Sequence, residues 1–251
     1  MEFANAIRHA RSRRRRVGVE ALRRFVVRFA SLGLAVCVSG APVLAEDGTA
    51  AAVGDTVILT EARPASTWAV ALYGGVWTNS TLPSFPYNAI RGRLTFEDAG
   101  IASLIVDRRL FDFGFGVPGT RWRLNGFSLE AEATLDQHLG LQDHVEATAA
   151  VKVRTGEIAL GSAVSMNLAW ANGLSYAFAE PKWEYGPTLV RGLDSRHLQY
   201  YMGFEAAFTP TSEKNLSAFF RLHHRSGIYG VISPRRTGSN YVGAGLRWTF
   251  R

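Results

Sequence analysis

The sequence has 251 residues, of which 47% are hydrophobic and 20% charged, which excludes a disordered chain and fits one large domain or two small ones. The formal net charge of +7 comes from residues 1–45, which hold nine Arg and two acidic residues and leave 19 basic (28 less nine) and 19 acidic (21 less two) residues for 46–251. Because the larger part is neutral, its composition does not support binding of nucleic acid.

Residues 1–45 have the organisation of a secretory signal peptide. Their arginines precede a mostly apolar stretch, Phe29 to Ala41, which is too short to span a bilayer, and small residues suited to cleavage follow at Val43 to Ala45. The one cysteine, Cys37, lies inside this segment. We therefore expect an exported chain that needs neither a disulfide nor a thiolate metal site.

After a short segment over 46–65, the chain alternates apolar with small or polar residues in runs of about ten, separated by Gly, Pro, Asn and Asp. Such alternation predicts strands that have one apolar face, because successive side chains of a strand point to opposite sides. The predicted strands cover 66–77, 100–111, 127–136, 144–153, 158–170, 198–208, 216–224 and 240–250.

The less apolar face of these strands carries charges of both signs. The residues concerned are Glu130, Glu132, Glu146, Lys152, Glu205, Arg221 and Arg247. A secreted soluble β-sandwich would turn this face to water, whereas a membrane barrel turns it to the interior, where the charges pair. Export and strands of about ten residues favour the barrel. We predict an all-β fold over 66–251, an eight-stranded antiparallel transmembrane β-barrel of the outer-membrane type, preceded by a periplasmic segment over 46–65.

An even number of strands puts both chain ends on the periplasmic side. The longest predicted connections, 78–99 and 171–195, then lie outside the cell, as outer-membrane barrels prefer. The aromatic final strand resembles the assembly signal of outer-membrane proteins, so the barrel-assembly machinery is an expected partner, together with the lipids of the bacterial outer membrane.

The end of the seventh strand carries a candidate nucleophile and base. Counting in twos from Leu222, His224 and Ser226 face the lipid, whereas His223 faces the interior. His224 could act as general base on Ser226, and Asn240 of the last strand falls near enough to orient the imidazole. Because the adjacent histidines point to opposite faces, we do not expect them to share a metal ion.

Three arginines are placed at the same rim by the sequence. Arg225, Arg235 and Arg236 are either hydrated surface residues or ligands for the phosphates of lipopolysaccharide.

The segments His224-Arg225-Ser226 and Gly238-Ser239-Asn240-Tyr241 resemble the corresponding motifs of the outer-membrane lipid A 3-O-deacylases, the PagL-like family. The resemblance covers roughly the last 35 residues. It implies an eight-stranded barrel whose lipid-facing triad removes an ester-linked acyl chain from lipid A, with no metal and no organic cofactor. The roles carried over are nucleophile for Ser226, base for His224 and third member for Asn240.

Two positions depart from the family pattern. Gly227 follows the serine where the family has Asn, and Asn240 stands where a carboxylate is usual. Activity should therefore fall, or an acid must come from elsewhere, for example Asp194 or Glu184 in the long connection. The alternative is therefore a non-catalytic small outer-membrane barrel, a structural or surface-binding protein that works through its external loops. A channel is a third possibility, which eight strands disfavour because side chains fill so narrow a barrel.

Overall fold

The computed structural model describes residues 68–119, 123–181, 184, 196–234 and 237–250. The predicted signal peptide over 1–45 and the segment over 46–65 lie outside the described residues.

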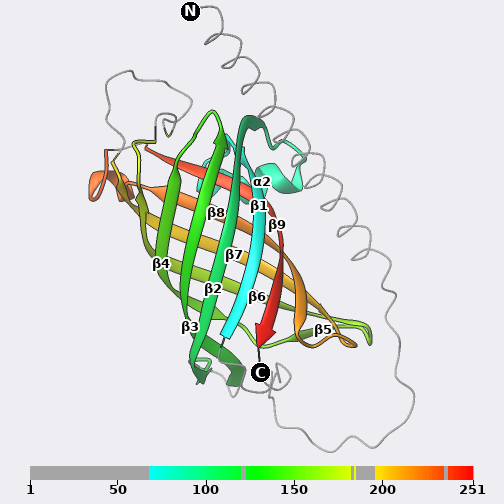
Figure 1. Cartoon of the computed structure of the whole chain (residues 1–251). Coiled ribbons are helices and arrows are strands. Elements are labelled where there is room, and N and C mark those ends of the chain that lie inside the picture. The colour runs from blue at the N-terminus through cyan, green and yellow to red at the C-terminus, as the bar shows by residue number, and fades with distance from the viewer. Residues whose placement is uncertain (1–67, 120–122, 182–183, 185–195, 235–236, 251) are drawn as a thin grey trace, which may run out of the picture.

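Eight long antiparallel strands form a closed ring (Figure 1). They are β1 (Trp68–Thr78), β2 (Phe96–Gly116), β3 (Arg123–Gly140), β4 (Val145–Arg154), β6 (Val164–Ala177), β7 (Leu198–Pro210), β8 (Leu216–Ser226) and β9 (Gly238–Phe250). Each pairs with the next in this order, and pairing of β1 with β9 closes the ring. The predicted eight-stranded barrel is confirmed.

The fifth predicted strand, 158–170, is wrong in its bounds. Its first residues form a separate short strand, β5 (Ile158–Leu160), which pairs with the start of β6. Gly161 begins the turn between the two and has a φ of +79°, a conformation that glycine adopts readily. The alternation of apolar and polar residues therefore runs through a turn and does not mark one continuous strand.

In the described parts of the connections there are three short helical elements: η1 (Leu82–Ser84), α2 (Phe85–Ile90) and η2 (Ile228–Gly230). Within the described part of the chain, no helix is both long enough and apolar enough to cross a bilayer. The connections that follow β1, β3, β6 and β8 belong to the end of the barrel opposite Trp68 and Phe250, and this end is called the outer rim.

The outer wall is apolar. Large hydrophobic side chains are exposed on most strands of the ring, among them Leu72, Leu104, Leu135, Val151 and Leu246. A water-soluble sheet would bury these residues, whereas a hydrocarbon environment accommodates them. The alternation in the sequence therefore has the orientation of a membrane barrel, with the apolar face outward.

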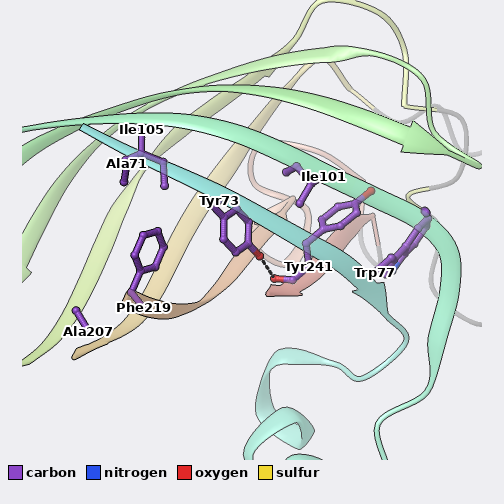
Figure 2. Packing of buried hydrophobic residues seen from close by; sticks show 9 residues of the cluster. Ala71, Tyr73, Trp77, Ile101, Ile105, Ala207, Phe219 and Tyr241 are labelled. Atoms are coloured by element: carbon purple, nitrogen blue, oxygen red, sulfur yellow. Dashed lines mark hydrogen bonds between the residues drawn. The ribbon is translucent and has the colours of Figure 1, made fainter. Parts of the chain in front are cut away.

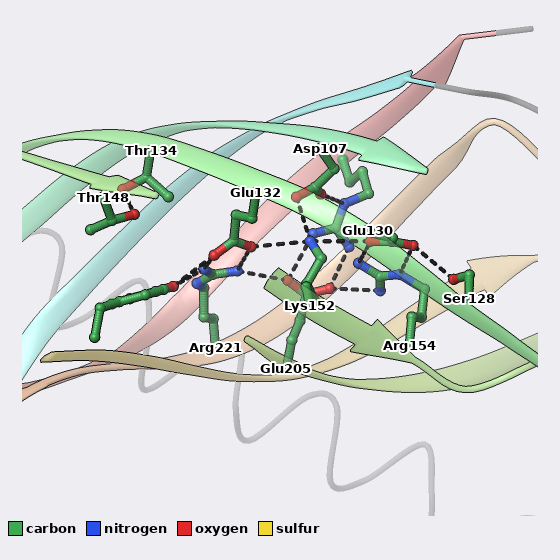
Figure 3. A network of polar contacts seen from close by, with 12 residues as sticks. Asp107, Ser128, Glu130, Glu132, Thr134, Thr148, Lys152, Arg154, Glu205 and Arg221 are labelled. Carbon is green, nitrogen blue, oxygen red and sulfur yellow. Dashed lines mark hydrogen bonds and ion pairs between the residues drawn. The ribbon is translucent and has the colours of Figure 1, made fainter. Parts of the chain in front are cut away.

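The interior holds a network of ion pairs (Figure 3). Glu205 receives hydrogen bonds from Arg154, Arg221 and Arg247, at 2.9 Å from Arg154 Nη1 and 3.1 Å from Arg221 Nη1. Lys152 contacts Asp107 and lies 3.1 Å from Glu132, which Arg221 also binds. Charges removed from water are tolerated only when they are paired in this way. The inward orientation predicted for the charged residues is confirmed by their burial.

Aromatic side chains fill another part of the interior (Figure 2). The Tyr73 hydroxyl donates a hydrogen bond to the Tyr241 carbonyl at 3.1 Å, and its ring stacks on Phe219 with centroids 6.3 Å apart. Trp77 packs on Tyr241 at 6.1 Å. These contacts join β1, β8 and β9, the strands that carry the candidate site.

Candidate active site at the outer rim

The register of β8 against β9 brings the sequence-predicted residues together. His224 lies directly opposite Asn240, and Ser226 lies opposite Gly238. His224 and Ser226 are two residues apart on one strand and therefore share its lipid-facing side, roughly 6 to 7 Å apart along the strand. Both are half-buried, and Asn240 is buried.

The His224 imidazole and the Asn240 amide are hydrogen-bonded. His224 Nδ1 lies 2.6 Å from Asn240 Oδ1, and Asn240 Nδ2 donates to the Ser80 carbonyl at 2.7 Å. A carbonyl oxygen only accepts, so Ser80 fixes which end of the Asn240 amide faces the histidine. The oxygen facing His224 needs a donor, and the imidazole therefore carries its proton on Nδ1. Nε2 is left with a lone pair and can serve as a base.

Ser80 is the residue that sequence reasoning missed. It lies in the connection between β1 and β2, where its own N–H bonds the Thr78 side chain at 3.3 Å and Asn88 donates to its hydroxyl at 3.1 Å. These bonds hold the carbonyl that anchors Asn240. Its contribution comes from the backbone, so no side-chain motif in the sequence could have identified it.

Ser226 ends β8 beside this pair. Among the described residues, no hydrogen bond joins its hydroxyl to His224. Catalytic hydrogen bonds are often long in a ligand-free site and shorten when substrate binds, so the arrangement remains suited to a nucleophile and base.

The turn after Ser226 explains why glycine follows it. A Cβ atom on Gly227 would lie 2.3 Å from the Ser233 carbonyl oxygen, and the N–H groups of Gly230 and Ile232 donate to the Gly227 carbonyl. The chain thus curls back onto Gly227, leaving no room for a larger residue. Within this turn Ile228 has a φ of +46°, which is rare for a β-branched residue and marks local strain.

Arg225 does not lie on the rim surface, and the expectation that it binds phosphates there is wrong. It alternates with His224 and Ser226, so its side chain points into the barrel, where it is 0% exposed. Its guanidinium pairs with Glu184 at 2.5 Å. Arg235 and Arg236, the other two arginines proposed for phosphate binding, lie outside the described residues.

The two acids considered as substitutes for a catalytic carboxylate have different outcomes. Glu184 is buried inside the barrel, where it accepts hydrogen bonds from Gln199 and Ser239 as well as Arg225, so it faces away from His224. Asp194 lies outside the described residues. His223 points inward as predicted, with Nε2 3.2 Å from Glu146.

The fold and the apolar wall define an eight-stranded β-barrel of the bacterial outer membrane. The chain is similar to the outer membrane enzyme PagL, with 13% identity and a TM-score of 0.45 over 72% of this chain and 99% of that one. It is also similar to Neisserial surface protein A (12%, TM-score 0.42, over 74% of this chain and 98% of that one). LpxR from Salmonella typhimurium is 8% identical, with a TM-score of 0.33 over 74% of this chain and 69% of that one.

No protein-family model matches the chain, and no curated protein matches it either. At the identities found, the likeness to solved structures concerns the barrel alone and says nothing of the chemistry at the rim.

Proposed function

We propose that this protein is an outer-membrane esterase that removes an ester-linked acyl chain from the lipid A part of lipopolysaccharide. The observation that carries the proposal is the hydrogen-bonded chain from His224 through Asn240 to the Ser80 carbonyl, on the lipid-facing wall beside Ser226. An imidazole held in one tautomer next to a serine is the arrangement that serine esterases use.

The reaction follows from this arrangement. His224 Nε2 takes the hydroxyl proton as Ser226 Oγ attacks the ester carbonyl carbon. The tetrahedral intermediate then breaks the bond to the sugar oxygen, which leaves with the proton from His224. Water attacks the acyl-serine by the same route, releases the fatty acid and restores the hydroxyl. Throughout the reaction, Asn240 Oδ1 accepts a hydrogen bond from His224 Nδ1 and keeps the ring in place.

The location of these residues suits a lipid substrate. His224 and Ser226 lie on the wall that faces the bilayer, at the outer rim, where the acyl chains and headgroups of the surrounding leaflet are in reach. The resemblance of the last residues to the lipid A 3-O-deacylases supports the same substrate. Asn240 in place of an acid supplies orientation without a charge, so we expect slower turnover than a carboxylate would give.

The experiment is mass spectrometry of lipid A from cells that express the wild type, Ser226→Ala or His224→Gln. The wild type is expected to produce lipid A lacking one acyl chain, and both variants to leave it intact. Ser212→Ala, on an exposed serine in the turn between β7 and β8, is the matched control and should behave as wild type. Intact lipid A in cells that contain folded wild-type barrel would contradict the proposal.

A non-catalytic barrel is the second candidate function. It is favoured by one observation, that the described residue bonded to His224 is an uncharged amide. In that case the connections of the outer rim would form the working surface, and the lipid A of expressing cells would not change.

A further inference from the structure

A second cluster of polar side chains lies inside the barrel, at the end of the β3–β4 hairpin, and the proposed esterase does not use it. His138 ends the inward row of β3, His144 lies in the connection over 141–144, and Glu146 begins the inward row of β4. All three are buried. One ligand atom from each lies within 4.8 Å of one from each of the others.

His144 is the unusual member of this cluster. It is 5% exposed, and its Nε2 has no hydrogen-bond partner among the described residues. Its ring stacks on His138 with centroids 4.1 Å apart and 13° between the planes. A buried imidazole nitrogen without a hydrogen-bond partner is well suited to bind a metal ion.

Glu146 supplies the negative charge. Arg225 approaches it with Nε at 3.4 Å, but that nitrogen makes no hydrogen bond and the guanidinium is shared with Glu184. The carboxylate is also hydrogen-bonded to His138, His223 and Ser175. A buried polar atom without a partner is costly, and a bound cation would satisfy His144 Nε2 while adding to the partners of Glu146.

Hydrogen bonds from surrounding residues, the outer contacts of the cluster, hold its ligand atoms in fixed directions. His138 Nδ1 lies 3.0 Å from the Tyr241 hydroxyl, so Nε2 is directed at Glu146, 2.7 Å away. Ser175 donates to the other Glu146 oxygen at 2.6 Å. Such partners hold ligands in position around metals. Two ligand atoms on a tetrahedral Zn²⁺ are about 3.3 Å apart, so His138 and Glu146 need to separate only slightly.

We propose that His138, His144 and Glu146 form a Zn²⁺ site inside the barrel. Two imidazole nitrogens and one carboxylate oxygen are a common zinc ligand set, which leaves a fourth position for water or a neighbouring side chain. The ion would tie the 141–144 connection to both strands of its hairpin. The inference departs from the sequence-based expectation of no metal and does not depend on the proposed esterase.

A different triad shares Glu146. Asp136, Glu146 and His223 also bring ligand atoms within 4.8 Å of one another. His223 Nε2 already has Glu146 as its hydrogen-bond partner, so unlike His144 Nε2 it does not need a new one. We therefore place the ion on the His144 side, and the experiment separates the two triads.

The test uses the full folded barrel in detergent micelles, freed of metal with a chelator and titrated with Zn²⁺ against a chromophoric chelator. Wild type should bind one equivalent. Tyr241→Phe, which removes an outer contact, should weaken Zn²⁺ binding by about 10–100-fold. His144→Gln and His138→Gln, which remove a ligand, should weaken it by more. His223→Gln should bind as wild type, as should His197→Gln, which removes an exposed histidine near the same rim.

Folding of each variant is checked by its unboiled mobility on denaturing gels. If a ligand variant fails to fold, the wild type still decides, because Co²⁺ in this site should give the strong visible absorption of tetrahedral coordination. Absence of stoichiometric Zn²⁺ binding in the wild type would overturn the proposal. So would equal loss in His197→Gln, or loss in His223→Gln with binding retained in His144→Gln.

Discussion

His224 and Asn240 face each other across the β8–β9 ladder, with His224 Nδ1 2.6 Å from Asn240 Oδ1. The two residues lie on different strands, and the register of the β8–β9 hairpin brings them together. Because the Ser80 carbonyl binds the amide nitrogen of Asn240, the amide presents its oxygen to the ring. In the proposed esterase, this relationship orients the lipid-facing histidine as the base.

Replacing Asn240 should therefore reduce turnover more than substrate binding. Asn240→Ala removes the acceptor for the Nδ1 proton, and we expect kcat for lipid A deacylation to fall about 10²-fold with little change in KM. Asn240→Asp keeps an acceptor and should retain more activity than alanine. Steady-state kinetics of the purified variants measure both effects. Equal activity of wild type and Asn240→Ala would show that the amide does not orient the base.

Gly227→Asn restores the residue that the resembling family has after its serine, yet we expect it to lower activity. The new Cβ would lie 2.3 Å from the Ser233 carbonyl oxygen, so the turn must open and carry Ser226 with it. The measurement is deacylation by Gly227→Asn and Gly227→Ala at matched barrel content. Both should be impaired, since the clash begins at Cβ. A gain in activity by the asparagine variant would contradict this account of the turn.

Glu184 should stabilise the outer rim, because it is buried and bonded to Arg225, Gln199 and Ser239. Glu184→Gln leaves the Arg225 charge without its closest partner, and we expect the free energy of unfolding to fall by about 3 kcal/mol. Urea unfolding of the barrel in micelles gives the value. Glu180→Gln, the same change at an exposed position of the same connection, should have almost no effect. Similar values for the two variants would contradict the role given to Glu184.

The apolar wall makes a separate prediction about the membrane. Leu72 is 66% exposed at the middle of β1, beside Leu104 and Leu246 on the neighbouring strands. Leu72→Arg should destabilise the barrel in phospholipid vesicles by about 2–4 kcal/mol, the usual cost of an arginine at the bilayer midplane. Leu72→Ala is the comparison for loss of the side chain alone. If vesicle-inserted barrel tolerates arginine as well as alanine, Leu72 does not face hydrocarbon.

Strand periodicity was enough to predict the ring and the direction of most side chains. A pleated strand alternates strictly, so His223 and His224 could be assigned to opposite faces without a structure. The same rule places Arg225 inside, because it lies between two outward-facing residues. The rim position expected for Arg225 was wrong because it rested on the residue's place at the strand end alone.

The remaining features depend on contacts that periodicity does not report. Asn240 is anchored only because β1 pairs with β9 and brings the Ser80 carbonyl within hydrogen-bond distance. Any residue type could supply that backbone carbonyl. The His138–His144–Glu146 cluster requires a connection that folds inward, so that His144 joins side chains from two strands. By contrast, Gly161 was a usable signal that the run over 158–170 contains a turn.

The most direct test of the proposed function uses purified wild type and Ser226→Ala in mixed micelles with lipid A, with products followed by mass spectrometry. The account predicts that wild type releases one equivalent of fatty acid per lipid A together with the matching deacylated product, and that Ser226→Ala releases none. Intact lipid A after incubation with folded wild type, or equal release by Ser226→Ala, would contradict it.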